Sequence, residues 1–287
     1  MKSKISFTII LMAVLFVPLW AQTEANFSVT RTEDGRGIRI IGYAGNITAV
    51  RIPVTIQGLP VTEIESMVAN PFGPESNITT VTIPASVTTI QEGAFSSCPR
   101  LTSIIVDENN PNYSSENGIL YDKAKTTLIR APGGISGMVS IPAGVRSIGN
   151  YAFFGCSSLT VVNIPEGVTS IGVNAFNNCS SLTVVHIPAS VTSIGDSAFQ
   201  YCSRLTDIRI PAGLTSIGGY SFLGCTSIAS ISIPTSVRSI GIVAFAQWTD
   251  TQTITVEGYA NQAAADTAFG GSRWRQSCNA QIVYQGQ

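Results

Sequence analysis

A repeat of 23 residues constrains this chain more than any other feature of its sequence. Three markers recur in register: an Ile-Pro dipeptide, a small residue followed by Phe, and a Cys three positions after that Phe. The Ile-Pro pairs begin at Ile141, Ile164, Ile187, Ile210 and Ile233, with an earlier copy at Ile83 and a weaker one at Ile52. This period predicts a solenoid, because a single unit cannot bury its apolar side without stacked neighbours.

One copy, residues 159–179, indicates how each coil is built. Leu159, Val162 and Ile164 are spaced so that a short strand points them toward the core, and Pro165 ends that strand because it has no N–H to donate. Residues 168–172 are expected to turn the chain back, and Ala175-Phe176 is expected to close the coil on the convex side. We therefore predict a leucine-rich repeat solenoid of 23-residue units with a parallel strand on the concave face.

The regularity fails at both ends and once in the middle, which sets the expected boundaries. We place an N-terminal hairpin cap at 22–46, the repeat array at 47–250 and a C-terminal α/β cap at 251–287. The step from Ile83 to Ile141 is 58 residues, one repeat plus 35, so we assign an insertion at 107–138 as a degenerate coil with a hairpin. Atypical end units are expected, because a solenoid must cover its terminal apolar faces.

The first 21 residues have the pattern of a secretory signal peptide. Lys2 and Lys4 precede an uncharged run from Ile5 to Trp20, and the small residue Ala21 comes before the polar Gln22. A single N-terminal membrane anchor is the alternative, although the run is short for a bilayer and contains Pro18. The favoured reading is residues 1–21 as a cleaved signal, no membrane span afterwards, and a protein that is secreted, periplasmic or at the cell surface.

Composition excludes several classes of function. Only 11% of the residues are charged, the formal net charge is −1, and there is one His. A nucleic-acid binder needs many cations to neutralise phosphates, so that class is not expected. The scarcity of His and carboxylates likewise leaves little material for acid–base or metal chemistry. We expect no enzyme, no cofactor and no metal site.

The repeating unit, running from Ile164-Pro165 through Cys179 to Leu182, resembles the BspA-like leucine-rich repeat proteins of bacterial surfaces. The segment Asn109–Tyr121 and the end of the chain from Gly258 to Ile282 are also similar to elements of that family. The resemblance implies a secreted or surface-displayed protein that binds other proteins, often an adhesin for host extracellular-matrix proteins or for other cells.

The outward positions of the predicted concave strand are the candidate ligand-binding residues. They are small and mostly polar, which suits a protein or an extended polymer better than a small molecule. The candidates are Thr160, Val161, Asn163, Thr183, Val184, His186, Thr206, Asp207, Arg209, Ser230 and Ser232. Three alternatives stay open. Ser and Thr occur there only because strands tolerate them, aromatic residues at Tyr113, Tyr121 and Trp274 make the contacts instead, or those aromatic residues only pack the insertion and the cap.

Two further chemistries can be read from the sequence. His186 with Asp207 and Ser230 or Ser232 has the composition of a catalytic triad, but an exposed surface histidine is the favoured interpretation. The cysteines at Cys98, Cys156, Cys179, Cys202 and Cys225 keep the repeat spacing, so we expect a column of buried thiols rather than disulfides. Cys278 lies outside that column. A secreted structural or spacer protein without a dedicated ligand site is the alternative function.

Overall fold

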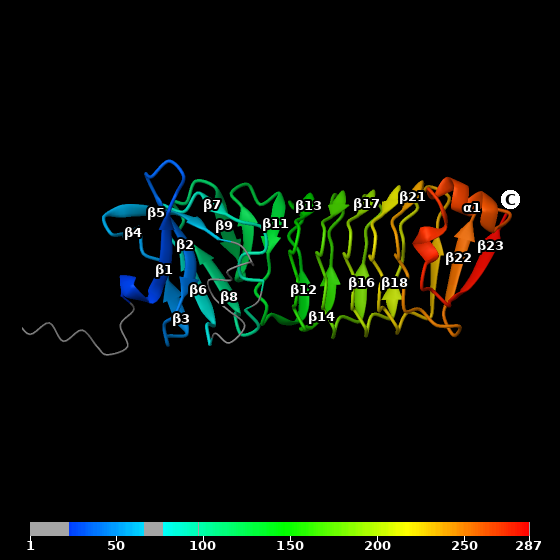
Figure 1. Cartoon of the computed structure of the whole chain (residues 1–287), viewed down its shortest axis with the longest axis horizontal. Helices are drawn as coiled ribbons and strands as arrows, with labels where there is room; N and C mark the ends of the chain where they lie inside the picture. The colour runs from blue at the N-terminus through cyan, green and yellow to red at the C-terminus, as the bar shows by residue number, and fades with distance from the viewer. Residues whose placement is uncertain (1–22, 66–76, 97, 287) are drawn as a thin grey trace, which may run out of the picture.

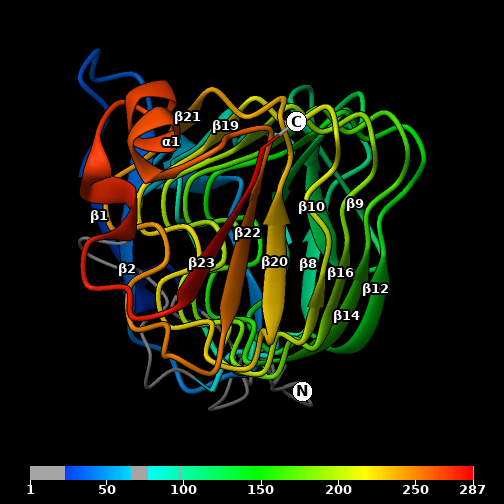
Figure 2. The ribbon, with the colours of Figure 1, turned by 90° about the vertical axis from the view of Figure 1, so that its right-hand side faces the viewer.

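The computed structural model describes residues 23–65, 77–96 and 98–286, so the expected signal peptide lies outside the described residues. The chain winds into a long stack of coils with the two ends at opposite ends of the stack (Figure 1). Viewed along that axis, the coils lie on top of one another, and successive long strands are displaced sideways from β12 to β23 (Figure 2). The predicted repeat solenoid is confirmed.

Each coil of the regular array contributes a strand of two to six residues at the L-x-x-V-x-I segment, and we call these the long strands. The long strands are β12 (Ser136–Ser140), β14 (Ser158–Asn163), β16 (Val184–His186), β18 (Asp207–Ile208), β20 (Ser230–Ile233), β22 (Thr253–Glu257) and β23 (Gln281–Gln285). Strands β12 to β18 pair in parallel in one sheet, and β20 to β23 pair in parallel in another. The equivalent strands nearer the N-terminus are β3 (Ala49–Arg51), β6 (Thr80–Ile83) and β8 (Ser103–Val106).

A second parallel sheet runs along the stack where the sequence predicted only a turn. Its members have two residues each, Ser followed by Ile: β13 (Ser147–Ile148), β15 (Ser170–Ile171), β17 (Ser193–Ile194), β19 (Ser216–Ile217) and β21 (Ser239–Ile240). Each strand is too short to show the alternation that identifies a strand in a single sequence. Stacking supplies what a single coil lacks, because every strand finds a neighbour of identical sequence in the same register.

The core is a set of identical side chains stacked from coil to coil. Phe153, Phe176, Phe199, Phe222 and Phe245 are fully buried, and consecutive rings are stacked with centroids 4.9, 5.1, 5.6 and 5.5 Å apart. That spacing is close to the distance between paired strands, roughly 4.8 Å. Backbone pairing and ring stacking therefore have nearly the same period, so each added coil satisfies both.

The cysteine column forms part of this core. The thiols of Cys179, Cys202 and Cys225 each donate a hydrogen bond to the carbonyl of the Phe 26 residues earlier, with Sγ···O distances of 3.0, 3.1 and 3.0 Å. In the last coil Trp248 replaces Cys, and its Nε1–H donates to the Phe222 carbonyl at 2.9 Å. The repeat thus needs a donor at this position, and Cys is the usual one.

Both ends of the stack are closed by irregular units. At the N-terminus a short 3₁₀ turn, η1 (Glu24–Asn26), leads into an antiparallel hairpin of β1 (Phe27–Arg31) and β2 (Ile38–Tyr43). Strand β2 pairs with β5 (Leu59–Ile64), which also pairs with β4 (Thr55–Ile56) and β7 (Thr89–Ile90).

At the C-terminus, helix α1 (Gln262–Ala268) and the 3₁₀ turn η2 (Ser272–Arg275) cover the last coil. Trp274 is fully buried and packs edge-on against Phe245, with ring centroids 6.1 Å apart. The expected α/β end unit is therefore present.

The insertion is an antiparallel meander of β9 (Tyr113–Glu116), β10 (Ile119–Asp122) and β11 (Thr127–Arg130). Strand β11 pairs in parallel with β13, so the insertion extends the short-strand sheet instead of leaving the stack. Two hydrophobic clusters meet here, one built from the N-terminal coils and one from the regular array.

Candidate functional site

The candidate ligand residues lie on the outward side of the long strands, as expected. We call this surface the long-strand face and define it by the outward side chains of β12, β14, β16, β18 and β20. Val161 pairs with Val184 and Asn163 with His186 in the parallel register, so these four side chains form two adjacent columns. The structure thus brings the central candidates together across neighbouring coils.

The threonines of the long-strand face are engaged by the backbone. The Thr183 hydroxyl donates to the Thr160 carbonyl at 3.0 Å, and the Thr206 hydroxyl donates to the Thr183 carbonyl at 3.2 Å. These hydroxyls therefore extend the inter-coil hydrogen bonding and are already used structurally. The reading that Thr occurs here because strands favour it accounts for these two positions.

An apolar stripe crosses the same face beside the threonines. Met138 is 66% exposed and pairs with Val161, which in turn pairs with Val184; both valines are half-buried. Asn163 borders the stripe, and its amide donates to the Ser140 hydroxyl at 3.3 Å. Met138 was not a candidate in the sequence, because it lies inside the insertion expected at 107–138. Its register with Val161 appears only once β12 is placed.

The hydrogen-bonded ladder of this face is interrupted between β18 and β20. Within the described residues, no backbone hydrogen bond joins the two strands, and they belong to separate sheets. A cavity of about 440 Å³ opens there, lined by Thr206, Asp207, Ile208, Arg209, Ile210, Ser230, Ile231 and Ser232. Five of the eleven candidates line this opening, which we call the open rung. The 23-residue spacing is unbroken there, so the missing rung could not be predicted from the residue pattern.

Charges at the open rung have no ion-pair partner among the described residues. Asp207 and Arg209 are exposed, and neither lies within 4 Å of an opposite charge. On the other side of the opening, the Ser232 hydroxyl donates to the Glu257 carboxylate at 2.5 Å. The open rung therefore offers a cation, an anion and unpaired strand edges to a partner.

The composition of a catalytic triad does not become a triad in the structure. His186 is exposed on β16, whereas Ser230 and Ser232 belong to β20, beyond β18 and the open rung. Within residues 98–286 no hydrogen bond links His186 to either serine or to Asp207. A triad requires contact between nucleophile and base, and these residues do not make it.

Two of the alternative aromatic contacts are wrong. Tyr121 is 1% exposed and Trp274 is fully buried, with its indole N–H donating to Asp266 at 3.0 Å. Tyr113 is half-buried, and its hydroxyl accepts a hydrogen bond from the Ile90 amide at 2.9 Å. Stacking in the insertion and the C-terminal unit buries these rings, so they act as packing residues.

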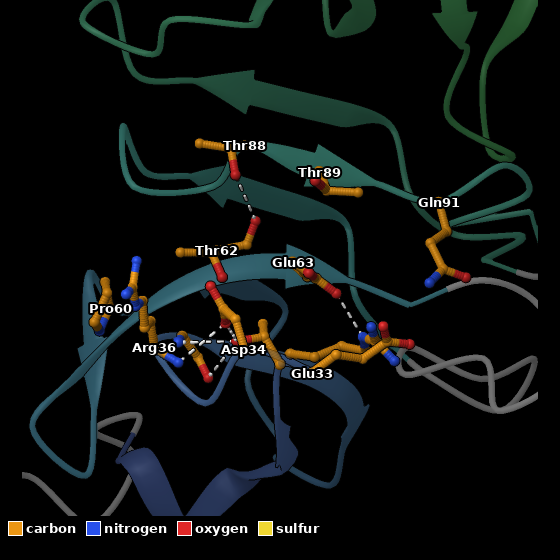
Figure 3. A pocket seen from close by; sticks show the side chains of 12 residues that line it. Glu33, Asp34, Arg36, Pro60, Thr62, Glu63, Thr88, Thr89 and Gln91 are labelled. Carbon is orange, nitrogen blue, oxygen red and sulfur yellow. Dashed lines mark hydrogen bonds and ion pairs between the residues drawn. The ribbon is translucent and has the colours of Figure 1, made fainter.

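A second hollow of about 620 Å³ lies beside the N-terminal hairpin (Figure 3). Three of the charged residues that line it have hydrogen-bond partners within its wall. Arg39 Nε is 2.6 Å from a Glu63 carboxylate oxygen, and this hydrogen bond raises the pKa of Arg39. Asp34 accepts from the Thr32 hydroxyl at 2.6 Å and from the Arg36 amide at 3.0 Å, and these bonds lower the pKa of Asp34. These groups already bond to one another or to their neighbours, and we do not assign a ligand to this hollow.

The comparison with protein-family models decides the family. A BspA-type leucine-rich repeat region, in six copies, matches residues 46–132 and 137–269. The chain belongs to the BspA-type leucine-rich repeat family. A search of curated proteins gave no match.

Solved structures show the same fold. The pneumococcal vaccine antigen PcpA superposes with a TM-score of 0.55 at 21% identity over 79% of this chain; the match spans 60% of PcpA, less than two thirds of its length. A leucine-rich cell surface protein from Faecalibacterium prausnitzii gives 0.52 at 20% identity, covering 93% of this chain and 95% of that one. A leucine-rich repeat protein from Bacteroides ovatus gives 0.53 at 20% identity, with 91% and 70% covered.

Proposed function

We propose that this BspA-type protein binds another protein through its long-strand face and catalyses no reaction. The observation that carries the proposal is the apolar stripe of Met138, Val161 and Val184, which ends at the open rung with its unpaired Asp207 and Arg209. Protein interfaces combine an apolar centre with a polar rim. A broad face built of short side chains accommodates another protein surface better than a small ligand.

The proposed partner is a host extracellular-matrix protein or a cell-surface ligand, and the proposed role is adhesion. The proposed location is outside the cytoplasm, on the cell surface, in the periplasm or secreted. The signal-peptide pattern of residues 1–21 supports export, and the similar protein from Faecalibacterium prausnitzii is a cell surface protein. Within the described residues, no helix has the length and apolar character needed to cross a membrane.

The second candidate is a structural or spacer role. It is supported by the continuous pairing of the short-strand sheet from β11 to β21. An uninterrupted sheet of this kind serves as a spacer without a bound ligand. In that role the long-strand face would be a consequence of stacking, and substitutions on it would change no binding property.

Binding to a panel of purified extracellular-matrix proteins tests the proposal. We expect saturable binding to at least one of them, and Val184→Lys should weaken it about tenfold or more, as for residues at the centre of an interface. The matched control is Ser216→Lys, which places the same charge on the short-strand sheet and should leave affinity unchanged. Binding lost in the control but kept in Val184→Lys would overturn the assignment of the face. Absence of binding across the panel would favour the spacer role.

A further inference from the structure

One layer of the convex side is missing at the insertion. In the regular array the convex turn at 149–155 lies directly on the next one: Tyr151, Phe153 and Gly155 donate to the carbonyls of Val173, Ala175 and Asn177 at 2.9, 2.7 and 2.8 Å. The insertion supplies three strands but no such turn, because the chain runs from β11 through Ala131 directly toward β12. The convex turns at 91–96 and 149–155 therefore face each other without a turn between them, and we call the space between them the vacant layer. Ala131 enters one side of it, where its amide donates to the Ala152 carbonyl at 2.7 Å.

The side chain of Arg130 occupies part of that layer. Its Nη2 donates to the Phe95 carbonyl at 3.2 Å on one side and to the Phe154 carbonyl at 2.9 Å on the other, and its Nη1 donates to the Tyr151 carbonyl. In regular coils the Phe carbonyl receives a cysteine thiol, so the guanidinium replaces the donors that the absent turn would provide. Arg130 is 2% exposed.

The guanidinium has no anionic partner. No carboxylate lies within 4 Å of it among the described residues, and its Nε–H has no hydrogen-bond partner. A buried cation without an anion is costly, because carbonyl oxygens replace only part of its hydration. Desolvation accordingly lowers the pKa of Arg130. A negatively charged group beside Nε would remove this penalty.

The remainder of the vacant layer is a pocket of about 210 Å³. Its walls are mostly apolar and include Ile90, Ala94, Ile129 and Gly149, with Arg130 among the lining residues. At its edge the Asn150 amide donates to both oxygens of the Glu92 carboxylate, at 3.0 and 3.1 Å. A water molecule takes about 30 Å³ of liquid, so the pocket has room for roughly seven non-hydrogen atoms.

We propose that this vacant-layer pocket binds a short unbranched monocarboxylate of four or five carbons. The carboxylate accepts from the Arg130 Nε–H, and the alkyl chain lies against Ile90, Ala94 and Ile129. Charge-assisted hydrogen bonds of this kind are about twice as strong as neutral ones. Glu92 at the edge opposes the ligand by like-charge repulsion and thereby weakens its binding. The proposal is independent of the protein-binding role of the long-strand face.

Calorimetric titration of the purified protein with butyrate tests this site, with butyramide as the neutral probe of the same shape. We expect butyrate to bind about tenfold more tightly than butyramide, which corresponds to about 1.4 kcal/mol. Glu92→Gln should strengthen butyrate binding several-fold, because it removes the repelling charge. Equal affinities for the two probes, or no saturable binding of butyrate, would overturn the proposal.

Arg130 also supports the fold, so substituting it would not separate lost binding from misfolding. A variant that fills the pocket with a larger side chain avoids this problem. Ile129→Phe enlarges a half-buried side chain that lines the pocket and leaves Arg130 in place. We expect it to abolish butyrate binding with an unchanged circular-dichroism spectrum. Ile187→Phe, at a half-buried position on a distant coil, is the matched control and should bind as the parent does. Butyrate binding that survives Ile129→Phe would contradict the assignment of the pocket.

Discussion

The two sheets of this solenoid are built from the same coils but differ in completeness. The short-strand sheet pairs without interruption from β11 to β21, and its Ser147 and Ser170 hydroxyls lie 3.1 Å apart in a column that later coils continue. The long-strand face carries exposed apolar side chains and loses its pairing at the open rung. One sheet therefore sets the spacing of the stack, and this leaves the other free to vary.

The glycine that follows each Ser-Ile strand explains why the short-strand sheet keeps the same geometry from coil to coil. A methyl group placed on Gly218 would lie 2.4 Å from the backbone of Gly195 and Asp196, and one on Gly195 would lie 2.7 Å from the backbone of Gly172. Neighbouring turns touch backbone to backbone at this column, so only Gly fits. The long-strand positions Val161, Val184 and Asp207 point to solvent and have no such constraint.

Hydrogen exchange should separate the two sheets most clearly. The Thr253 amide donates to the Ala229 carbonyl, so the Ser230 amide points the other way, into the open rung. We expect it to exchange about a thousandfold faster than the amide of Gly218, which donates to Ile194 at 2.8 Å. Mass spectrometry or NMR of the exchanging protein measures this. Equal protection of the two amides would show that the rung is closed in solution.

The cysteine thiols in the core between the two sheets should be unreactive until the protein unfolds. Burial raises the pKa of Cys156 to about 11 and of Cys225 to about 12, so the reactive thiolate is scarce at neutral pH. Thiol titration is expected to detect almost none of the column in the native protein and at least four thiols in denaturant. Failure to find them in denaturant would mean that the column forms disulfides.

Substitution of the glycine column tests the steric part of the comparison. Gly218→Ala should destabilise the protein by about 1–3 kcal/mol, because the overpacked backbone must move. Gly144→Ala is the control, since a methyl group there meets its nearest atom at 3.7 Å. Urea denaturation followed by circular dichroism measures both variants. If the two alanines had the same effect, close packing would not explain the regularity of the short-strand sheet.

The smallest effect on stability is expected from the Asp266–Arg275 pair of the C-terminal unit, which covers the end of both sheets. Asp266 accepts from Arg275 at 2.7 Å, and this bond lowers the pKa of Asp266 below its usual value. The folded state therefore binds that proton less readily than the unfolded state. Its contribution is present above about pH 4, the unfolded value, and is lost as the pH falls toward the folded value. Asp266→Asn should remove this part of the acid dependence of thermal unfolding and leave the rest.

The repeat made most of this architecture predictable. Once Val161, Val184 and their equivalents are assigned to one column, stacking places them side by side, and the hairpin and the final helix follow from local signals. The second sheet was missed because a Ser-Ile pair is a strand only beside its neighbours. The open rung and the placement of Arg130 depend on backbone geometry between coils, which residue spacing does not encode.

The most direct test of the account is a hydrogen-exchange footprint of the protein with a matrix protein that it binds. We predict that protection on binding is confined to the long strands β12, β14, β16, β18 and β20, including the amides of the open rung. The short strands β13, β15, β17, β19 and β21 should exchange as in the free protein. Protection concentrated on the short-strand sheet or on the end units would contradict the assignment of the binding surface.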